Sequence, residues 1–338
     1  MARLSTKDKE KPFILIGAAV LGIIIQNILD SEFPWMNYVV EVGVFFVILA
    51  VMLPVEIKDV GGAFKKVKPT VIVIIVNFIV IPLFSGSMGW LILKHYPDFW
   101  VGAVLYTLTP CIGWYLIFTD LAEGDVAWGI SLLPWNITLQ IILMPLYLYF
   151  LIGKVIPVDF SALARSVVLF LIAPFVLGFV IQKYLIKKKG KDYFFGKFKS
   201  ALSEVKLWAL VVVILSMFIS QKSLTISEIN KVGLLIIFLI VFFFVLFLLA
   251  VLIGKIFELG YADTVTMAFT TTARNSEAVI GVAVAAFPGH PLVYMAIILG
   301  PIVELPLLLV IAKIIMQFRK FLDGKTGALP SQVKLLQK

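Results

Sequence analysis

Two apolar stretches of this sequence carry charged side chains that lipid-spanning helices rarely contain. Residues 300–306 read GPIVELP and place the carboxylate of Glu304 between two prolines; residues 270–277 read TTTARNSE and add Arg274 and Glu277. A charge at the centre of a bilayer costs roughly 3 kcal/mol or more, so such groups usually face a partner or a water-filled path. A structural Arg–Glu clamp between helices is one interpretation of this set. We favour a transport site.

The composition indicates which elements would position these groups. The chain is 61% apolar with a mean hydropathy of +1.06, whereas a soluble domain is roughly half apolar. Apolar runs long enough to cross a hydrocarbon layer of about 30 Å recur throughout. The sequence therefore predicts an all-α membrane protein with ten transmembrane helices. We place them at residues 13–29, 36–54, 70–93, 99–121, 126–152, 162–185, 205–220, 231–254, 263–287 and 291–317.

The distribution of basic residues orients the chain. With the N-terminus in the cytoplasm, the inner loops and both termini receive most of the 29 lysines and arginines. The outer loops receive only Lys94, Lys154, Lys222 and Lys231. Because cytoplasmic loops are enriched in Lys and Arg, we expect a multi-pass protein of the plasma membrane with both termini in the cytoplasm. Contact of these loops with anionic lipid also explains the net charge of +9 without nucleic acid.

Several classes of function lack the residues they would need. Cys111 is the one cysteine, which excludes an internal disulfide framework, and His95 and His290 belong to no cluster with metal-ligand spacing. The sequence has no glycine-rich phosphate loop, which argues against an ATP-driven pump. An intramembrane enzyme would need a metal constellation or a nucleophile–base pair, and neither is apparent. We expect no metal, no cofactor and no enzymatic activity.

The ten segments divide into two halves of five. We place the first repeat at residues 1–157, the second at 158–320 and a cytoplasmic tail at 321–338. Because five is odd, two related halves must enter the membrane in opposite senses, which gives an inverted repeat. The fourth and ninth segments hold corresponding places in the two halves, and polar residues interrupt both of them.

The interruption of the fourth segment reads TLTPCIG over residues 107–113 and ends at Gly113. Pro110 removes a backbone donor and clashes with the preceding turn. Unpaired backbone at that depth is tolerated only inside protein or along a wet cavity. We therefore predict that helices 4 and 9 are broken and cross near the midplane; a simple proline kink is the alternative. Thr109, Asn136 and Asn275 are candidate polar linings of the site.

The residues around these breaks resemble those of the ten-helix arsenite permeases of arsenical resistance, in the bile acid/sodium symporter superfamily. The matching motifs are TPCIGWYLIFT and AEGD in the fourth segment, LLPWNITLQ in the fifth, ARNS and AFP in the ninth, and GPIVELP in the tenth. The resemblance implies a core of helices 3–5 and 8–10, which carries the broken helices and moves against a panel of helices 1, 2, 6 and 7. In that family a cysteine matching Cys111 and a glutamate matching Glu304 are tied to activity.

The chemistry of these two residues agrees with the implied substrate. Arsenous acid is neutral at pH 7 and prefers sulfur to oxygen, and a thiol near a helix N-terminus or an arginine is a good thiophile. Pro110 favours a half-helix that starts at Cys111, whose dipole would assist the thiolate. The alternative is that Cys111 is a small apolar filler. With Glu304 as the proton carrier, the resemblance implies a secondary transporter that exports arsenite, or its analogue antimonite, in exchange for protons.

Arg274 leaves two questions open. It could hold Glu304 charged, or pair with Glu277 one turn further along its own helix. It also stands where the sodium-coupled branch of the superfamily carries a glutamine beside an asparagine, and a fixed guanidinium there opposes Na⁺. We therefore expect proton coupling or uniport. The alternative function is sodium-driven uptake of an organic anion such as a bile acid, with Arg274 as the anion ligand.

Overall fold

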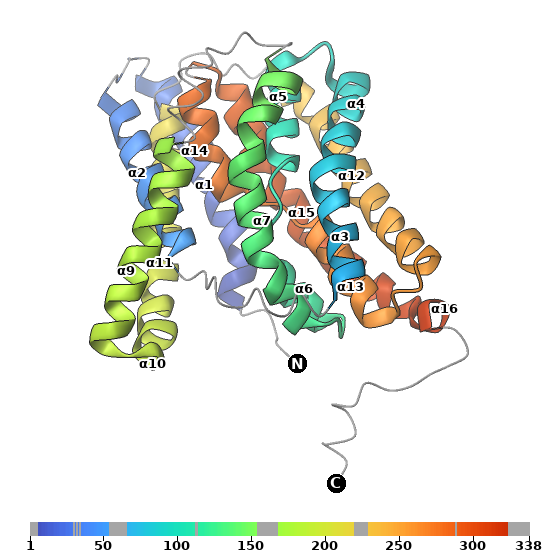
Figure 1. Ribbon diagram of the computed structural model, residues 1–338. Helices are drawn as coiled ribbons and strands as arrows, with labels where there is room; N and C mark the ends of the chain where they lie inside the picture. Colours follow the sequence, from blue (N-terminus) through green and yellow to red (C-terminus); the bar gives the residue numbers. More distant parts are fainter. Residues whose placement is uncertain are drawn as a thin grey trace.

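The computed structural model describes residues 6–29, 31, 33, 35–53, 66–111, 114–153, 168–219, 229–287 and 289–323. These residues are almost entirely helical, with no strand among them and one isolated antiparallel bridge. Long helices run side by side through the molecule in Figure 1, with the short helices α6, α10 and α16 at its lower end. The described part of the chain confirms the all-α membrane class.

Two of the long helical runs in the first half contain a π-helical turn. The elements of this half are α1 (Thr6–Leu29), α2 (Trp35–Met52), α3 (Val67–Ile75), η2 (Val76–Val80), α4 (Ile81–Leu93), α5 (Pro97–Thr107), α6 (Trp114–Leu121), α7 (Val126–Tyr147) and η3 (Leu148–Ile152). Without a gap, α3, η2 and α4 form one continuous run, and η3 extends α7.

The second half contains the two longest described α-helices, α12 and α15. Its elements are η4 (Val168–Ile172), α9 (Ala173–Lys189), α10 (Lys191–Tyr193), η5 (Phe194–Phe198), α11 (Lys199–Ile219), α12 (Ile229–Ile256), α13 (Tyr261–Thr272), α14 (Ser276–Ala286), α15 (Pro291–Gln317) and α16 (Arg319–Asp323). Each of the ten segments predicted from the sequence overlaps one, two or three of these elements. The predicted repeat boundary at 157/158 lies outside the described residues.

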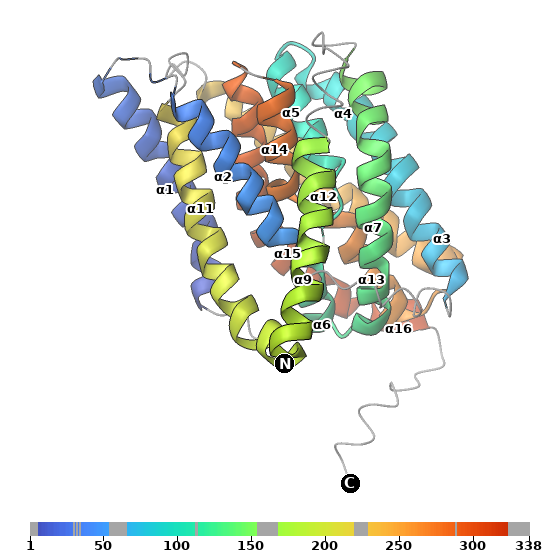
Figure 2. The same cartoon turned by 60° about the vertical axis from the view of Figure 1, so that its left-hand side comes forward.

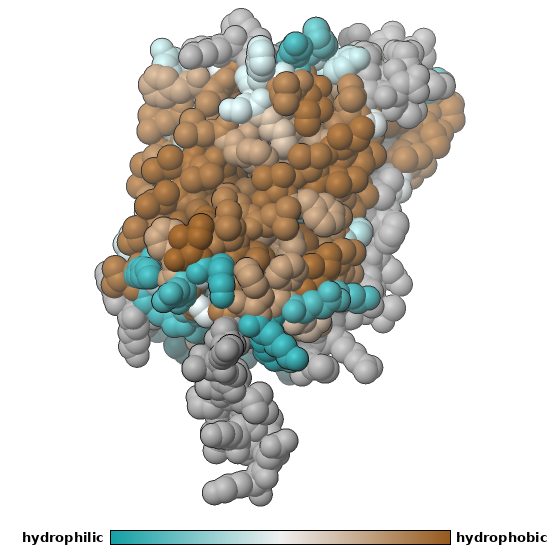
Figure 3. All heavy atoms as spheres, turned by 90° about the vertical axis from the view of Figure 1, so that its right-hand side faces the viewer, coloured by the Kyte–Doolittle hydropathy of each residue, from teal (hydrophilic) through white to brown (hydrophobic). Residues whose placement is uncertain are grey.

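Length and composition decide which helices can cross a bilayer. Among the described residues, four runs are long and apolar enough by themselves: Val67–Leu93, Val126–Ile152, Val232–Ile256 and Pro291–Gln317. At 1.5 Å per residue, their 25 to 27 residues span more than a hydrocarbon layer of about 30 Å. Figure 3 shows the corresponding apolar belt, with hydrophilic residues gathered at its lower edge. The apolar side chains at the surface of the belt are those expected to face lipid.

The helices pack in two groups. In the first, α11 packs on α1 and α2, and α9 lies against α2 (Figures 1 and 2). Glycine permits this close packing, because a Cβ atom at Gly43 of α2 would overlap the side chain of Val213 on α11. In the second group α5 packs on α15, and α12 packs on α13. The groups meet where α14 contacts α2.

The described chain ends in a short helix. Residues 321–323, the first of the predicted cytoplasmic tail, belong to α16, which packs on α12 and α13. The ammonium of Lys255 donates a hydrogen bond of 2.7 Å to the carbonyl of Phe321. The rest of the predicted tail lies outside the described residues.

Candidate functional site

The chain leaves the helical conformation at two places in the interior. The first break separates α5, which ends at Thr107, from α6, which begins at Trp114, and it contains Pro110. The second separates α13, which ends at Thr272, from α14, which begins at Ser276. The second break contains no proline, so here the polar residues mark the interruption that the sequence predicted.

The two breaks are joined to each other through their backbones. The N–H of Cys111 donates to the carbonyl of Ala273 at 3.0 Å, and the N–H of Asn275 donates to the carbonyl of Thr109 at 2.9 Å. Together they form the isolated antiparallel bridge of the fold. Backbone groups freed by one break are thus satisfied by the other, as polar groups at membrane depth require.

Cys111 lies within the first break and is buried, with 3% of its surface exposed. Its N–H is bonded to Ala273 of the opposite break. The helix after it is described from Trp114, so a half-helix start directly after Pro110 falls on residues outside the described ones. Gly113, predicted to help break the helix, lies outside the described residues.

Glu304 is buried on α15, and each of its carboxylate oxygens receives a different donor. The hydroxyl of Tyr106, near the end of α5, donates to Oε2. The backbone N–H of Arg274, in the second break, donates to Oε1 at 3.0 Å. The carboxylate therefore connects α15 to one residue from each interrupted helix.

The guanidinium of Arg274 is 2% exposed and points at the ends of both interrupted helices. Nη1 donates to the carbonyl of Thr107, the last residue of α5, at 3.0 Å, and Nε donates to the carbonyl of Thr272, the last residue of α13, at 3.2 Å. Helix C-termini carry partial negative charge, so two of them stabilise one cation. The Phe242 ring lies 5.6 Å away. Nη2 has no hydrogen-bond partner among the described groups.

Among the residues whose side chains the structure describes, Glu304 is the glutamate that Arg274 contacts. Its backbone N–H binds Glu304, whereas its guanidinium binds carbonyl groups. Glu277 lies in α14, and its side chain falls outside the described residues.

The predicted polar linings hold the breaks and the neighbouring helices in place. The hydroxyl of Thr109 lies within hydrogen-bond distance of the Tyr106 and Asn275 carbonyls, at 3.0 and 3.1 Å. The Asn275 side chain caps α14 by accepting the Ala278 N–H at 3.1 Å, and its Nδ2 has no partner among the described groups.

Asn136 of α7 belongs to a separate buried cluster. Its Nδ2 donates to the Thr270 hydroxyl at 3.2 Å, and Asn77 of η2 donates to Asn136 Oδ1 at 3.4 Å. This cluster connects α7 and the π-helical turn to α13, one turn before the second break.

Comparison with known proteins places this site in a family. The pattern of the family described as "Sodium Bile acid symporter family" matches residues 41–228, which is more than half of the chain and includes the first break. The chain belongs to this family. It is therefore a membrane transport protein, and the superfamily predicted from its motifs is confirmed.

Relatives resemble this family member over different shares of their length. The arsenical-resistance protein Acr3 of Alkaliphilus metalliredigens (strain QYMF) is 24% identical over 89% of this chain and 88% of its own. The protein of the same name from Corynebacterium glutamicum is 25% identical over 91% of this chain and 88% of its own. A probable sodium/metabolite cotransporter, the chloroplastic BASS3 of Oryza sativa subsp. japonica, is 31% identical over 41% of this chain and 32% of its own.

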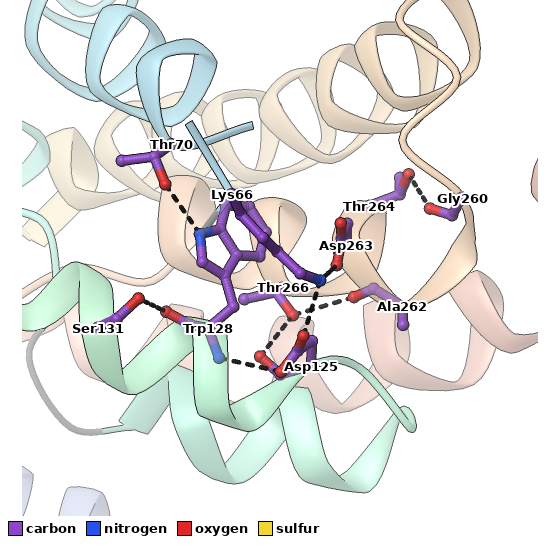
Figure 4. Close-up of polar contacts among 10 residues, drawn as sticks. All are labelled: Lys66, Thr70, Asp125, Trp128, Ser131, Gly260, Ala262, Asp263, Thr264 and Thr266. Carbon is purple, nitrogen blue, oxygen red and sulfur yellow. Dashed lines mark hydrogen bonds and ion pairs between the residues drawn. The ribbon is translucent and has the colours of Figure 1, made fainter. Parts of the chain in front are cut away.

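This member of the symporter family has a second charged cluster (Figure 4), near the lower end of the molecule as drawn in Figure 1. The ammonium of Lys66, which precedes α3, binds Asp125 at 2.7 Å and also binds Asp263 of α13. Asp125 caps α7 by accepting the Trp128 N–H at 2.9 Å. The indole of Trp128 lies 5.7 Å from the ammonium and donates to the Thr70 hydroxyl at 3.0 Å. The cluster ties the starts of α3, α7 and α13 together.

The charges of this cluster shift one another. Burial lowers the pKa of Lys66, but the hydrogen bonds and charges of the two aspartates outweigh burial and hold that pKa above its ordinary value of 10.5. Burial raises the pKa of Asp125, but its bonds with Lys66 and with the Trp128 N–H hold it below its ordinary value of 3.8. Both groups are therefore charged at neutral pH.

Sequence analysis missed three parts of the site. Tyr106 directly precedes the TLTP break, and Gly300 lies one turn before Glu304; the two helices come together only in the fold. Asn77 could have been noticed as the lone amide in a long apolar run. The Lys66 cluster joins residues up to 197 positions apart, so no local pattern indicates it.

Proposed function

We propose that this chain is a secondary transporter that exports arsenite, or antimonite, from the cytoplasm in exchange for protons. The observation that carries the proposal is the position of Cys111, a buried thiol in a break that is bonded to a second break, whose Arg274 N–H holds Glu304. The resemblance to two arsenical-resistance proteins over about nine-tenths of the chain supports the substrate. The chain is a carrier in this proposal and not an enzyme.

The architecture proposed for this carrier has ten transmembrane helices in two inverted repeats, residues 1–157 and 158–320, in the plasma membrane with both termini in the cytoplasm. Helices 3–5 and 8–10 form the moving core, and helices 1, 2, 6 and 7 form the panel. Two interrupted helices that meet in the interior support alternating access. A cavity of about 20 Å³, room for one water molecule, separates Leu210 of α11 from Ser276 and Pro301. The substrate path runs along this boundary.

The two chemical roles are divided between sulfur and oxygen. Cys111 binds arsenic as a soft ligand, and one thiol permits release where three would retain the metalloid. Glu304 takes up a proton on the outside and releases it in the cytoplasm. Asn275 and Thr109 line the site. The Nδ2 group of Asn275 is a donor for an arsenite oxygen.

Arg274 supports protons over sodium as the coupling ion. Its guanidinium already provides a positive charge at the carbonyl ends of α5 and α13, where a metal cation would otherwise find negative ends of helices. A second cation at the same place would meet an uncompensated like charge in a medium of low dielectric constant.

One observation favours a second function. Arg274 Nη2 is buried without a partner among the described groups, and a guanidinium donor can bind a carboxylate. Sodium-coupled transport of an organic anion is therefore the alternative, and the resemblance to a probable sodium/metabolite cotransporter over 41% of the chain is in line with it.

The test combines growth with flux. In a bacterial host without its own arsenite exporter, the wild-type chain is expected to restore growth on arsenite, and Cys111→Ser is expected to remove that resistance while the protein remains in the membrane. In proteoliposomes, arsenite flux should follow an imposed pH gradient and ignore a sodium gradient. Normal resistance from the serine variant would remove the thiol from the mechanism. Flux driven by sodium alone would favour the organic-anion function.

A further inference from the structure

The two hydrogen bonds on Glu304 differ in a way that matters when the carboxylate gains a proton. The donor on Oε1 is the Arg274 backbone N–H, which can only donate. The donor on Oε2 is the Tyr106 hydroxyl, which carries both a proton and lone pairs and can therefore reverse its role. A proton placed on Oε1 would take the second lone pair of that oxygen, and the Arg274 N–H could not accept it. A proton added to Oε2 can be accepted by the tyrosine oxygen.

The packing around Tyr106 keeps its ring in this position. The side chain is fully buried, and the ring lies against Gly300, one turn before Glu304 on α15. A Cβ atom at position 300 would overlap the ring. Gly102 of α5 is equally close to the backbone of Val293, so α5 and α15 are held together along several turns. The ring cannot move away from the carboxylate, whereas its hydroxyl proton can rotate.

We propose that Tyr106 is a positioning residue that directs the proton of Glu304 to Oε2 and reverses its own hydrogen bond when that proton arrives. One proton is taken up by the carboxylate, Tyr106 keeps its own proton, and the hydroxyl changes from donor to acceptor. Oε1 keeps its bond to the Arg274 N–H in both states. The inference rests on the proposed function only in that Glu304 gains and loses a proton during transport.

The reversal affects the two interrupted helices differently. The second break remains bound to α15 in either protonation state because the Arg274 N–H does not change its role. On the α5 side a strong bond to a charged acceptor is exchanged for a bond between two neutral groups, which is roughly half as strong. Protonation of Glu304 therefore removes charge assistance from both bonds, but it reverses only the bond between α5 and α15.

The test is infrared difference spectroscopy of the protein in liposomes, titrated with acid. The carbonyl stretch of protonated Glu304 is identified as the band that Glu304→Gln removes. In Tyr106→Phe this band should move to higher frequency, because its O–H has lost its acceptor. Tyr294→Phe is the matched control. Tyr294 is buried like Tyr106 but lies on α15, and its hydroxyl donates to the Phe287 carbonyl at 2.5 Å, away from Glu304. It should leave the band in place.

Transport gives the second readout. The tyrosine hydroxyl stabilises the charged carboxylate, so without it the proton is held more tightly. Tyr106→Phe should move the pH for half-maximal proton-driven arsenite flux up by about one unit, the equivalent of one charge-assisted hydrogen bond. Gly300→Ala, which displaces the ring but keeps the hydroxyl, should move it in the same direction.

The outcomes separate this inference from the proposed function. A Glu304 band at the same frequency in wild type and Tyr106→Phe overturns the role of Tyr106 and leaves the transporter standing. The absence of any titrating Glu304 band in wild type overturns proton coupling as well. If Tyr106→Phe fails to enter the membrane, tyrosine labelled with ¹³C at the ring carbon that bears oxygen gives the answer in Tyr294→Phe. Its C–O stretch should shift with the Glu304 band, and a constant C–O stretch overturns the inference.

Discussion

The buried site and the lower charged cluster both combine basic and acidic side chains, but they pair them in opposite ways. Lys66 makes direct ion pairs with Asp125 and Asp263 at a place where all three side chains retain contact with solvent. In the interior, Arg274 and Glu304 are close neighbours, yet the guanidinium binds carbonyl groups and the carboxylate binds a hydroxyl and an N–H. Among the described side chains, neither buried charge has an opposite side-chain charge as a hydrogen-bond partner.

This difference indicates what each region can do. A direct ion pair in a dry interior fixes both charges, since removing one leaves the other unpaired at a cost of several kcal/mol. A carboxylate held by neutral donors can become neutral without leaving a bare partner. This difference fits the proposed mechanism, in which the charge of Glu304 changes, whereas the charges of the lower cluster persist.

The largest effect is expected when the changeable charge is removed. Glu304→Gln keeps the size of the side chain and its hydrogen bonding but cannot release a proton, so proton-driven arsenite flux in proteoliposomes should fall to the background of empty liposomes. The matched variant Asp263→Asn should lose only a few-fold, because Asp125 still pairs with Lys66. Comparable losses in the two variants would contradict the distinction between the regions.

Arg274→Gln is expected to have the next largest effect. It removes donors from the carbonyls of Thr107 and Thr272, and each buried carbonyl left unpaired costs roughly 1–3 kcal/mol. Thermal unfolding in detergent should therefore begin at lower temperature, and flux should drop. With the fixed cation gone, this variant is also expected to respond to sodium. Arg274→Lys keeps the charge and should remain insensitive to sodium; a sodium response in both variants would remove the charge argument.

Lys66→Met should have the smallest effect. Partly exposed ion pairs contribute about 0.2–1 kcal/mol each, so the loss of two lowers stability by about 1 kcal/mol and flux by a small factor. Asp125, whose pKa is lowered in the fold, contributes to the free energy of unfolding. This contribution is present above the ordinary pKa of 3.8 and is lost as pH falls through the lowered pKa of the folded state. The contribution of Lys66, whose pKa is raised in the fold, is present below pH 10.5 and is lost as pH rises through the raised pKa of the folded state.

The free energy of unfolding of wild type and of Lys66→Met, measured across pH, tests this pH dependence. The difference between them should be greatest between about pH 4 and 10 and should shrink at both extremes and in high salt. A difference that grows in acid would mean that the cluster does not act through its charges.

Local sequence was sufficient for much of the fold because membrane helices are encoded by long apolar runs. The breaks were predictable too, one from Pro110 and the other from the polar run around Arg274. The bridge between Cys111 and Ala273 was not predicted, because it pairs two breaks that are far apart in the sequence. The partners of Glu304 depend on α5 lying on α15, which no local pattern reveals.

The bonds of the buried site join distant parts of the chain, and this has a consequence for biosynthesis. Tyr106 and Glu304 are 198 residues apart, and the Arg274 guanidinium reaches back 167 residues to Thr107. During synthesis the end of α5 must wait in the bilayer until α13 and α15 have been inserted. Any truncated chain that stops before α13 exposes these unpaired groups to lipid, which makes it a ready substrate for membrane quality-control proteases.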